Sequence, residues 1–341
     1  MADADHEVLS TAQAAAWAAG RTPAPEQVAD DVWAIACPIP GGSLPYTLSY
    51  ALRSPEGVHL VDPGWDAEGN LDVLDAGLRV AGAALADVRT VIATHFHPDH
   101  LGLAARIRAR TGAEIVLSAT DRVVLAQESA HAAGDRAALA DTLAAWGVPE
   151  GRRSELLGMG SRPPVAPEAE PDRLVGDGDL LALAGHSLLV VATPGHTGGH
   201  ICLADDDRRL IYTGDHVLPG IYAGVGIGVL EGSDPLGDYF DSLDRLAPYD
   251  DYTALPGHEY RFRGLRSRRE GIAAHHLRRT AEVAALIPSL GDAPIWDYAR
   301  RLTWSAGWEG LHGFHLLSAL RQTALHRDFV RSGRAASRLE R

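Results

Sequence analysis

Apolar and polar positions alternate along the first half of the chain in a way that predicts strands and helices in turn. Short apolar runs of strand length cover residues 32–37, 46–52, 58–62, 88–93 and 114–117. Longer stretches with helical periodicity cover residues 67–82 and 101–110. A short helix is also expected within residues 1–20. This alternation is typical of an α/β chain, although it does not separate a doubly wound sheet from a two-sheet sandwich.

The middle of the chain divides two regions that are rich in strands. Residues 120–160 are mostly helical and polar in pattern, and a proline-rich connector is expected over residues 163–171. Strands predominate again from residue 174 to residue 255, with one helix near residues 235–246. Two strand-rich halves are therefore expected to pack with helices around them.

The last part of the chain has a different character. Residues 265–287 form a long Arg-rich helical pattern, and residues 294–331 contain two more helical stretches. Four aromatic side chains would anchor this region: Trp296, Trp304, Trp308 and Phe314. We therefore predict a main domain over residues 1–264 and a small helical domain over residues 265–341.

Length and composition fit a chain with a large core. The 341 residues are 46% apolar, and the two cysteines cannot form a disulfide framework. Residues 1–20 lack the basic start and apolar stretch of a signal peptide, and no segment approaches the roughly 20 apolar residues that span a bilayer. A cytoplasmic protein without a membrane partner is expected.

The net charge is divided unevenly between the two domains. Residues 261–341 hold 15 Arg against 7 acidic residues, which is a charge of +8. Because the whole chain carries −14, residues 1–260 must carry −22. An acidic surface repels a phosphate backbone, and nucleic-acid binding is mainly electrostatic. The charge pattern argues against nucleic acid as a partner.

Metal-binding side chains are concentrated directly after the apolar run at residues 88–93. Four of them fall within six residues: His95, His97, Asp99 and His100. Three further candidates each follow a predicted strand: His196, Asp215 and His258. Imidazole with carboxylate is a ligand mixture that zinc favours, and strand ends are where a rigid scaffold presents functional groups.

The H-x-H-x-D-H run and the three later motifs, in this order, resemble the metallo-β-lactamase superfamily over residues 30–260. The resemblance is greatest to its dinuclear hydroxyacylglutathione-hydrolase-like group. It implies an α/β (α+β) fold, the αββα sandwich, followed here by a winged-helix-like C-terminal domain. It also implies that His95, His97 and His196 bind the first metal ion. Asp99, His100 and His258 would bind the second, and Asp215 would bridge the two.

Two zinc ions are the expected cofactors, and iron or manganese also suits such ligands. The pair would hold a bridging hydroxide that attacks the substrate. Asp99 and Asp215 are the expected catalytic residues, because Asp99 can deliver a proton to the leaving group and Asp215 keeps the ions together. Neighbouring residues expected to orient the ligands by hydrogen bonds are Asp62, Thr197 and His216.

The substrate is harder to predict than the nucleophile. True β-lactamases generally lack the bridging aspartate. Only 42 residues separate Asp215 from His258, which excludes the branch with a large inserted domain. Hydroxyacylglutathione hydrolases share all seven ligands, yet this chain has no lysine for their glutathione site. We therefore predict hydrolysis of an activated small-molecule acyl compound, such as a thioester, lactone or other ester.

Residues 217–233, rich in glycine and apolar side chains, would form a wall of the substrate site. Candidate substrate-binding residues, each with a structural alternative, are Tyr46, Tyr222, Tyr260, Arg261 and Arg263. The alternative function is a metal-dependent endoribonuclease or phosphodiesterase assisted by the C-terminal domain. A scaffolding protein on a dead fold would show lost ligands, and none is lost. A homodimer is left open.

Overall fold

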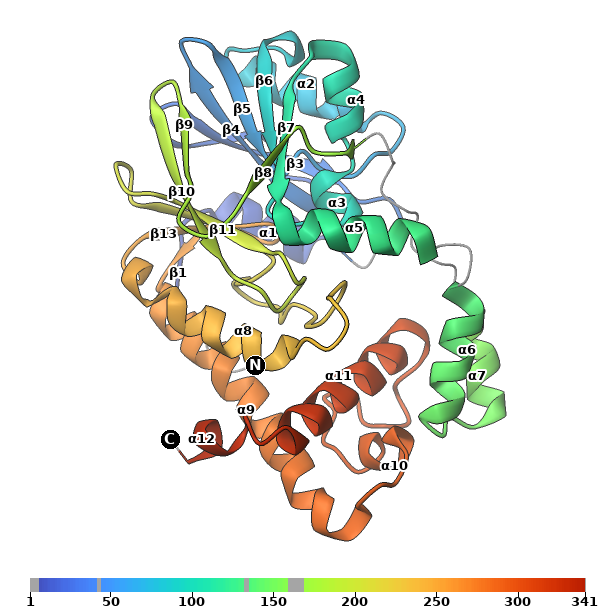
Figure 1. Cartoon of the computed structure of the whole chain (residues 1–341). Coiled ribbons are helices and arrows are strands. Elements are labelled where there is room, and N and C mark those ends of the chain that lie inside the picture. The colour runs from blue at the N-terminus through green and yellow to red at the C-terminus, as the bar shows by residue number, and fades with distance from the viewer. Residues whose placement is uncertain (1–5, 42–43, 132–134, 159–168, 341) are drawn as a thin grey trace.

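Two β-sheets pack face to face in the computed structural model, and helices cover both outer faces (Figure 1). The structure describes residues 6–41, 44–131, 135–158 and 169–340. This arrangement is an αββα sandwich, so the predicted fold class is confirmed. Part of the predicted connector, residues 163–168, lies outside the described residues.

The first sheet has the order β2-β3-β4-β5-β6-β7-β8. Its strands are β2 (Glu26–Ala29), β3 (Val32–Pro38), β4 (Tyr46–Ser54), β5 (Gly57–Val61), β6 (Val88–Ile92), β7 (Glu114–Ser118) and β8 (Arg173–Val175). The pairs from β2 to β5 are antiparallel, whereas β5, β6, β7 and β8 are parallel. Val61 is in register with Ile92. The segments that follow β5 and β6 therefore leave the sheet at the same edge.

The second sheet has the order β1-β14-β13-β12-β11-β10-β9. Its strands are β1 (Glu7–Val8), β9 (Leu180–Leu183), β10 (His186–Ala192), β11 (Ile201–Asp205), β12 (Leu210–Gly214), β13 (Thr253–Pro256) and β14 (Phe262–Arg263). Only the pair β12 and β13 is parallel, with Gly214 in register with Pro256. Two backbone hydrogen bonds join the sheets at this edge: Ile201 N–H donates to Thr94 O (2.9 Å), and Leu48 N–H donates to Gly257 O (2.7 Å).

Alternation along the strands divides the core into layers. On β4, Tyr50 faces the opposite sheet and Ala51 faces the outer helices; on β12, Tyr212 faces inward and Ile211 outward. The helices outside the first sheet are α2 (Asn70–Val80), α4 (Ala104–Thr111) and α5 (Ala119–His131). Those outside the second sheet are α8 (Pro235–Arg245), α9 (Leu265–Leu290) and α11 (Gly313–Arg331). Burial of both faces of each sheet accounts for the apolar runs in the sequence.

Short elements complete the main domain. They are α1 (Thr11–Ala18), α3 (Pro98–Leu101) and the 3₁₀ turns η1 (Leu85–Asp87) and η3 (Ala247–Tyr249). Ser10 caps α1 by accepting a hydrogen bond from the backbone N–H of Gln13, which agrees with the helix expected near the N-terminus. Among the described residues, none of the helices combines the length and apolar character needed to cross a bilayer.

The C-terminal region is helical, as predicted, and contains α9, α10 (Ile295–Ala299), α11 and α12 (Ala336–Leu339). Its described part, residues 265–340, contains no strand that could form a wing. Helices α6 (Asp135–Ala145) and α7 (Glu150–Leu157) share a hydrophobic cluster with α10 and α11, and Figure 1 shows the four side by side. The helical region is thus built from two distant parts of the chain.

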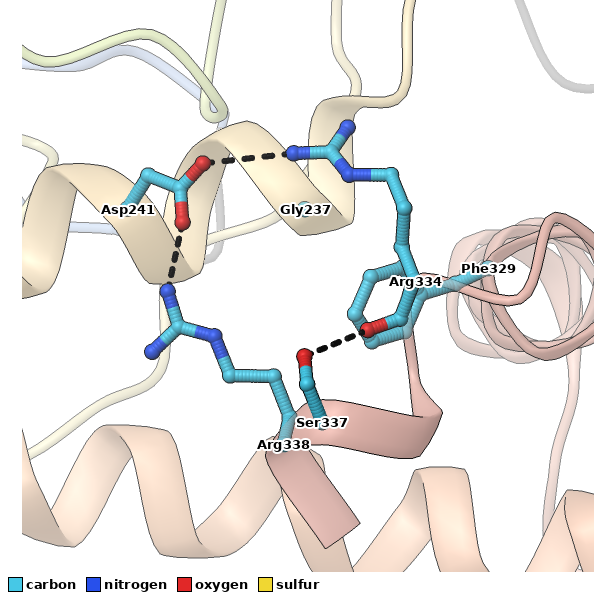
Figure 2. Close-up of a pocket in the computed structure, with 6 residues that line it drawn as sticks. All are labelled: Gly237, Asp241, Phe329, Arg334, Ser337 and Arg338. Atoms are coloured by element: carbon cyan, nitrogen blue, oxygen red, sulfur yellow. Dashed lines mark hydrogen bonds and ion pairs between the residues drawn. The ribbon is translucent and has the colours of Figure 1, made fainter.

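The charge imbalance in the sequence reappears as ion pairs that join α12 and the turn before it to α8 and its N-cap residue. Arg334 contacts Asp234 at 2.9 Å and Asp241 at 3.2 Å, and Arg338 contacts Asp244 at 2.6 Å. Figure 2 shows Asp241 receiving both guanidinium groups beside a small pocket lined in part by Phe329 and Ser337. Exposed pairs contribute little one by one, so this network supports the docking that the apolar contacts of α9 and α11 provide.

The interface of α8, α9 and α11 contains a buried histidine, His276. Its ring packs on Tyr239 and His326, and neither ring nitrogen has a hydrogen-bond partner among the described residues. Burial, reinforced by the charges of His275 and Arg279, lowers the pKa of His276 to about 3. The folded chain therefore holds this ring neutral, whereas the unfolded chain protonates it near its ordinary pKa.

Acid should weaken the fold through His276. Its contribution to stability is complete above pH 6.5 and is lost as the pH falls toward 3, at about 1.4 kcal/mol per pH unit. Between pH 7 and pH 5, His276→Leu should therefore lose roughly 2 kcal/mol less unfolding free energy than the wild type. Urea titrations at both pH values measure this. His315→Leu, at an exposed ring on α11, is the control. Equal losses in wild type and His276→Leu would contradict the prediction.

Candidate metal centre

Four loops meet at the edge where parallel strands end. One follows β6 and carries Thr94 to His100, with Pro98 opening the single turn of α3. The others follow β10, β12 and β13 and carry His196, Asp215 and His258. Parallel pairing places the loops after β12 and β13 side by side, and the hydrogen bond from Ile201 N–H to Thr94 O (2.9 Å) joins the start of β11 to the loop after β6.

Three imidazoles converge in the first part of the site. His97 Nδ1 lies 2.9 Å from His95 Nε2 and 3.1 Å from His196 Nε2. All three side chains are buried. Three nitrogens this close, with their rings nearly perpendicular, form one face of a metal-binding polyhedron.

The second part of the site mixes imidazole with carboxylate. Asp99 Oδ2 lies 3.4 Å from His258 Nε2 and 3.7 Å from His100 Nε2. Asp99 is the most accessible of these ligands, with 16% of its side chain exposed. These three residues form a second candidate metal-binding group.

Asp215 lies between the two groups. Its Oδ1 is 3.4 Å from His100 Nε2 and 3.3 Å from His258 Nε2, whereas its Oδ2 is 3.6 Å from His196 Nε2. One carboxylate oxygen thus faces each trio. The structure therefore brings together all seven side chains that the sequence nominated as ligands.

Hydrogen bonds on the outer nitrogen of each ring orient the five histidines toward this point. The outer partners are Thr94 Oγ1 for His95, Ile227 O for His97, Asp62 Oδ2 for His100, Gly224 O for His196 and Tyr46 O for His258. An outer N–H that donates leaves the inner nitrogen with a lone pair, the form that binds metal.

Three inner atoms are buried without a hydrogen-bond partner in the described protein: His100 Nε2, His258 Nε2 and Asp215 Oδ1. Buried polar atoms without partners cost free energy. These atoms face one another across 3.3–3.4 Å, so cations between them would satisfy all three. The residues therefore fit a pair of metal ions.

The electrostatics of the site keep the His95 imidazole neutral and the Asp215 carboxylate ionised. Burial, and then the neighbouring His100 and His97, hold the pKa of His95 well below its usual value, so its imidazole is neutral. Burial alone would raise the pKa of Asp215, but His258 and His100 hold it well below its usual value. Neutral imidazole and ionised carboxylate are the forms that coordinate metal.

Asp62 occupies the position that the sequence suggested, at the end of β5. Its carboxylate accepts hydrogen bonds from the Thr94 backbone N–H (2.7 Å), the Thr94 hydroxyl (2.9 Å) and His100 Nδ1 (2.8 Å). Its backbone has φ = 54°, a strained conformation for a residue other than glycine. Asp62 therefore contacts a candidate ligand directly.

The other two residues expected to orient ligands have different contacts. Thr197 donates its hydroxyl hydrogen bond to Asp121 (3.0 Å). His216 packs on Tyr239 at a ring distance of 4.7 Å. Among the described residues, neither side chain hydrogen-bonds to the side chain of a candidate ligand. Being next to a ligand in sequence therefore did not predict where these side chains point, since Asp215 faces the metal site and His216 packs on Tyr239 of α8.

Asp121, which the sequence did not single out, and His200 also contact the site. Asp121 accepts hydrogen bonds from the backbone N–H groups of Phe96 (3.0 Å) and Gly199 (2.7 Å), and burial raises its pKa to about 7. His200 Nε2 accepts the backbone N–H of Asp215 (3.2 Å). Asp121 joins two ligand loops and His200 supports a third. No motif spacing marks Asp121, which begins a helix far from both loops in sequence.

The structure does not gather the five predicted substrate-binding residues around the ligands. Tyr46 is buried and donates its hydroxyl to Glu259 O (2.7 Å), and Arg261 is buried in an ion pair with Glu26. Tyr260 contacts His6, Tyr222 stacks on His275, and Arg263 lies exposed on β14 with a hydrogen bond to Thr253. The polar groups of Tyr46 and Arg261 are satisfied by these buried partners, and a role of the five residues in substrate binding stays a prediction.

The fold and the seven converging side chains define an αββα protein with a dinuclear type of ligand set. A family model described as the metallo-beta-lactamase superfamily matches residues 43–258, more than half of the chain. The chain therefore belongs to the metallo-beta-lactamase superfamily, as the motifs predicted.

Two curated relatives show the range of similarity. A hydroxyacylglutathione hydrolase of Nitrobacter hamburgensis is 28% identical over 211 residues, which are 60% of this chain and 62% of that protein. The acyl-coenzyme A thioesterase MBLAC2 of Homo sapiens is 32% identical over 173 residues, 49% of this chain and 54% of that protein. The chain spans between a third and 62% of the length of the first curated relatives that it matches.

Two solved structures resemble the chain over most of its length. A metallo-beta-lactamase family protein from Thermus thermophilus has a TM-score of 0.70 and 27% identity, covering 89% of this chain and 94% of that chain. A beta-lactamase domain protein from Burkholderia ambifaria has a TM-score of 0.69 and 24% identity, covering 96% and 92%. The second shows likeness of fold alone.

Gently purified protein should carry about two transition-metal ions per chain, because one oxygen of Asp215 faces His100 and His258 while the other faces His196. Elemental analysis measures this directly. His97→Ala should lower the metal content, whereas His312→Ala, at an exposed histidine of the C-terminal region, should not. A stoichiometry of one that added metal does not raise would rule out the dinuclear assignment.

Gly257→Ala should disrupt the centre without removing a ligand. An added Cβ would lie 2.6 Å from His100 Cε1 and 2.7 Å from Asp215 Oδ1, and both distances are shorter than a normal non-bonded contact. We expect loss of bound metal and of activity. Gly271→Ala is the matched control, since a Cβ there meets nothing within 4 Å and alanine favours the helix. Normal metal content in Gly257→Ala would show that the site tolerates the shift.

Proposed function

We propose that the protein is a dinuclear metal-dependent hydrolase with zinc in both positions. His95, His97 and His196 would hold one ion, Asp99, His100 and His258 the other, and Asp215 would bridge them. The single observation that carries this proposal is Asp215, whose two oxygens face separate histidine groups at 3.3–3.6 Å. Two divalent cations, when bound, lower the pKa of a water molecule and polarise the substrate carbonyl.

Asp99 is the residue that we assign to proton transfer. Burial would raise its pKa, but the neighbouring His100 and His258 hold that pKa below its ordinary value. The carboxylate is therefore ionised near neutral pH, which is the state in which a general base begins its cycle. Because it is also the ligand most accessible to solvent, it can pass the proton to a departing group.

An activated acyl compound is the substrate class that we propose: a thioester, lactone or other ester. Two observations support it. Curated relatives are named hydroxyacylglutathione hydrolase and acyl-coenzyme A thioesterase, and residues 1–260 carry a charge of −22 that opposes polyanions. The cytoplasm, where Cys37 and Cys202 would stay reduced, is the compartment that we propose.

Zinc-loaded protein should cleave acyl thioesters, lactones or simple esters faster than bis-p-nitrophenyl phosphate or single-stranded RNA. Asp99→Asn should lower kcat for the preferred substrate by about a hundredfold or more. Asp66→Asn, which removes an exposed carboxylate paired with Arg106, should leave kcat unchanged. A substrate panel with steady-state kinetics decides the matter. Efficient, salt-sensitive RNA cleavage would instead establish the phosphodiesterase alternative.

A further inference from the structure

Two buried charged side chains form hydrogen bonds with the backbone of residues 218–221, which follow Asp215. Glu259 Oε2 accepts hydrogen bonds from the N–H groups of Gly220 (2.8 Å) and Ile221 (3.0 Å). Arg268 donates from Nε to Leu218 O and from a terminal nitrogen to Ile221 O, both at 2.5 Å. The carboxylate thus holds backbone donors while the guanidinium holds backbone acceptors. We call Glu259, Arg268 and residues 218–221 the clamp.

Burial makes this arrangement specific. Glu259 is 3% exposed and Arg268 is 8% exposed, and charges so buried are costly unless hydrogen bonds and an opposite charge stabilise them. Burial raises the pKa of Glu259, while the two backbone N–H groups and Arg268 oppose that rise. A Cβ on Gly220 would lie 2.4 Å from Glu259 Oε1, so glycine permits the close approach.

The clamp is covalently adjacent to two candidate ligands. Glu259 directly follows His258 and has φ = 69°, outside the relaxed range for its residue type. Leu218 is three residues beyond Asp215. Tyr46 ties the same corner together, because its hydroxyl donates to Glu259 O (2.7 Å) and its carbonyl accepts from His258 Nδ1 (2.8 Å). A shift of the clamp would therefore displace both ligands.

Arg268 belongs to the C-terminal region, which supplies none of the seven ligands. It lies on the first turns of α9, and its guanidinium sits 4.8 Å from the centroid of the Tyr222 ring. His275, two turns further along α9, also stacks on that ring, with 3.8 Å between the ring centroids. Helix α9 is thus attached to the glycine-rich segment at several points.

We propose that Arg268 is a positioning residue for the metal centre. Together with Glu259 it fixes the backbone between Asp215 and Tyr222, and so sets where Asp215 and His258 present their ligand atoms. This inference rests on the proposed dinuclear function. It makes the C-terminal region part of the centre's support, because small displacements of ligands weaken metal binding and turnover.

The test compares Arg268→Met with Arg269→Met in the full chain. Arg269 is the next residue of α9 and is equally buried, but it pairs with Asp250 at 2.7 and 2.8 Å, outside the clamp. Zinc binding to the metal-free protein is measured by chelator competition, alongside thermal unfolding. Arg268→Met should weaken one zinc site by about 10- to 100-fold. Arg269→Met should lower the melting temperature while both zinc affinities stay unchanged.

Two further measurements distinguish a local effect on the metal centre from general misfolding of the variant. Arg268→Lys keeps the charge but loses the fork of donors, so an intermediate loss of zinc affinity is expected. Hydrogen exchange of the Gly220 and Ile221 amides in metal-free protein should accelerate in Arg268→Met and not in Arg269→Met. Unchanged zinc affinity and exchange in the Arg268 variants, or equal zinc losses in Arg269→Met, would overturn the inference while leaving the proposed function intact. A wild-type chain that binds no zinc would overturn both.

Discussion

The burial of Asp215 is the constraint on which the rest of the centre depends. A carboxylate removed from water is costly unless charges or hydrogen bonds compensate it, and Asp215 Oδ1 has no donor among the described residues. His258 and His100 keep the carboxylate ionised, and Asp215 in turn raises the pKa of both imidazoles against the effect of their burial. Metal ions bound between these groups would displace the inner protons of both rings and supply the compensating charge in their place.

Backbone geometry determines where that arrangement can form. Parallel pairing of β5 with β6 and of β12 with β13 brings the segments after these strands to the edge of each sheet, and the ligand loops must pass close to one another there. Gly214 and Gly257 allow this, since a Cβ on Gly214 would lie 2.6 Å from His200 Nε2 and Thr94 Oγ1. The left-handed φ of Asp62 adds local strain that its three hydrogen bonds offset. Sheet register, glycine and strain together fix the ligand positions before any metal binds.

The parts of the fold that sequence could predict are those encoded locally. Period and length located most strands, and the ligands stood out because each follows a strand and carries a metal-binding group. Asp121 and Arg268 carried no such signal, because their roles arise from contacts with loops tens of residues away. Conversely, sequence does not give the direction of a side chain, and the polar groups of Tyr46 and Arg261 point to buried protein partners. The packing of α6 and α7 on α10 and α11 joins segments more than 100 residues apart, which no local pattern encodes.

The division of charge in the sequence acquires a physical meaning in the structure. The last 81 residues carry a charge of +8, and some of their arginines form ion pairs with carboxylates of the main domain at Asp234, Asp241, Asp244 and Asp250. The pairs at Asp234, Asp241 and Asp244 are exposed, so they are screened and individually weak, whereas the Arg269–Asp250 pair is buried. Arg268 differs from all of these arginines because it bonds to backbone carbonyls rather than to a carboxylate. An electrostatic bias that favours docking thus coexists with one desolvated contact that reaches the metal loops, and the second is where the helical region can influence chemistry.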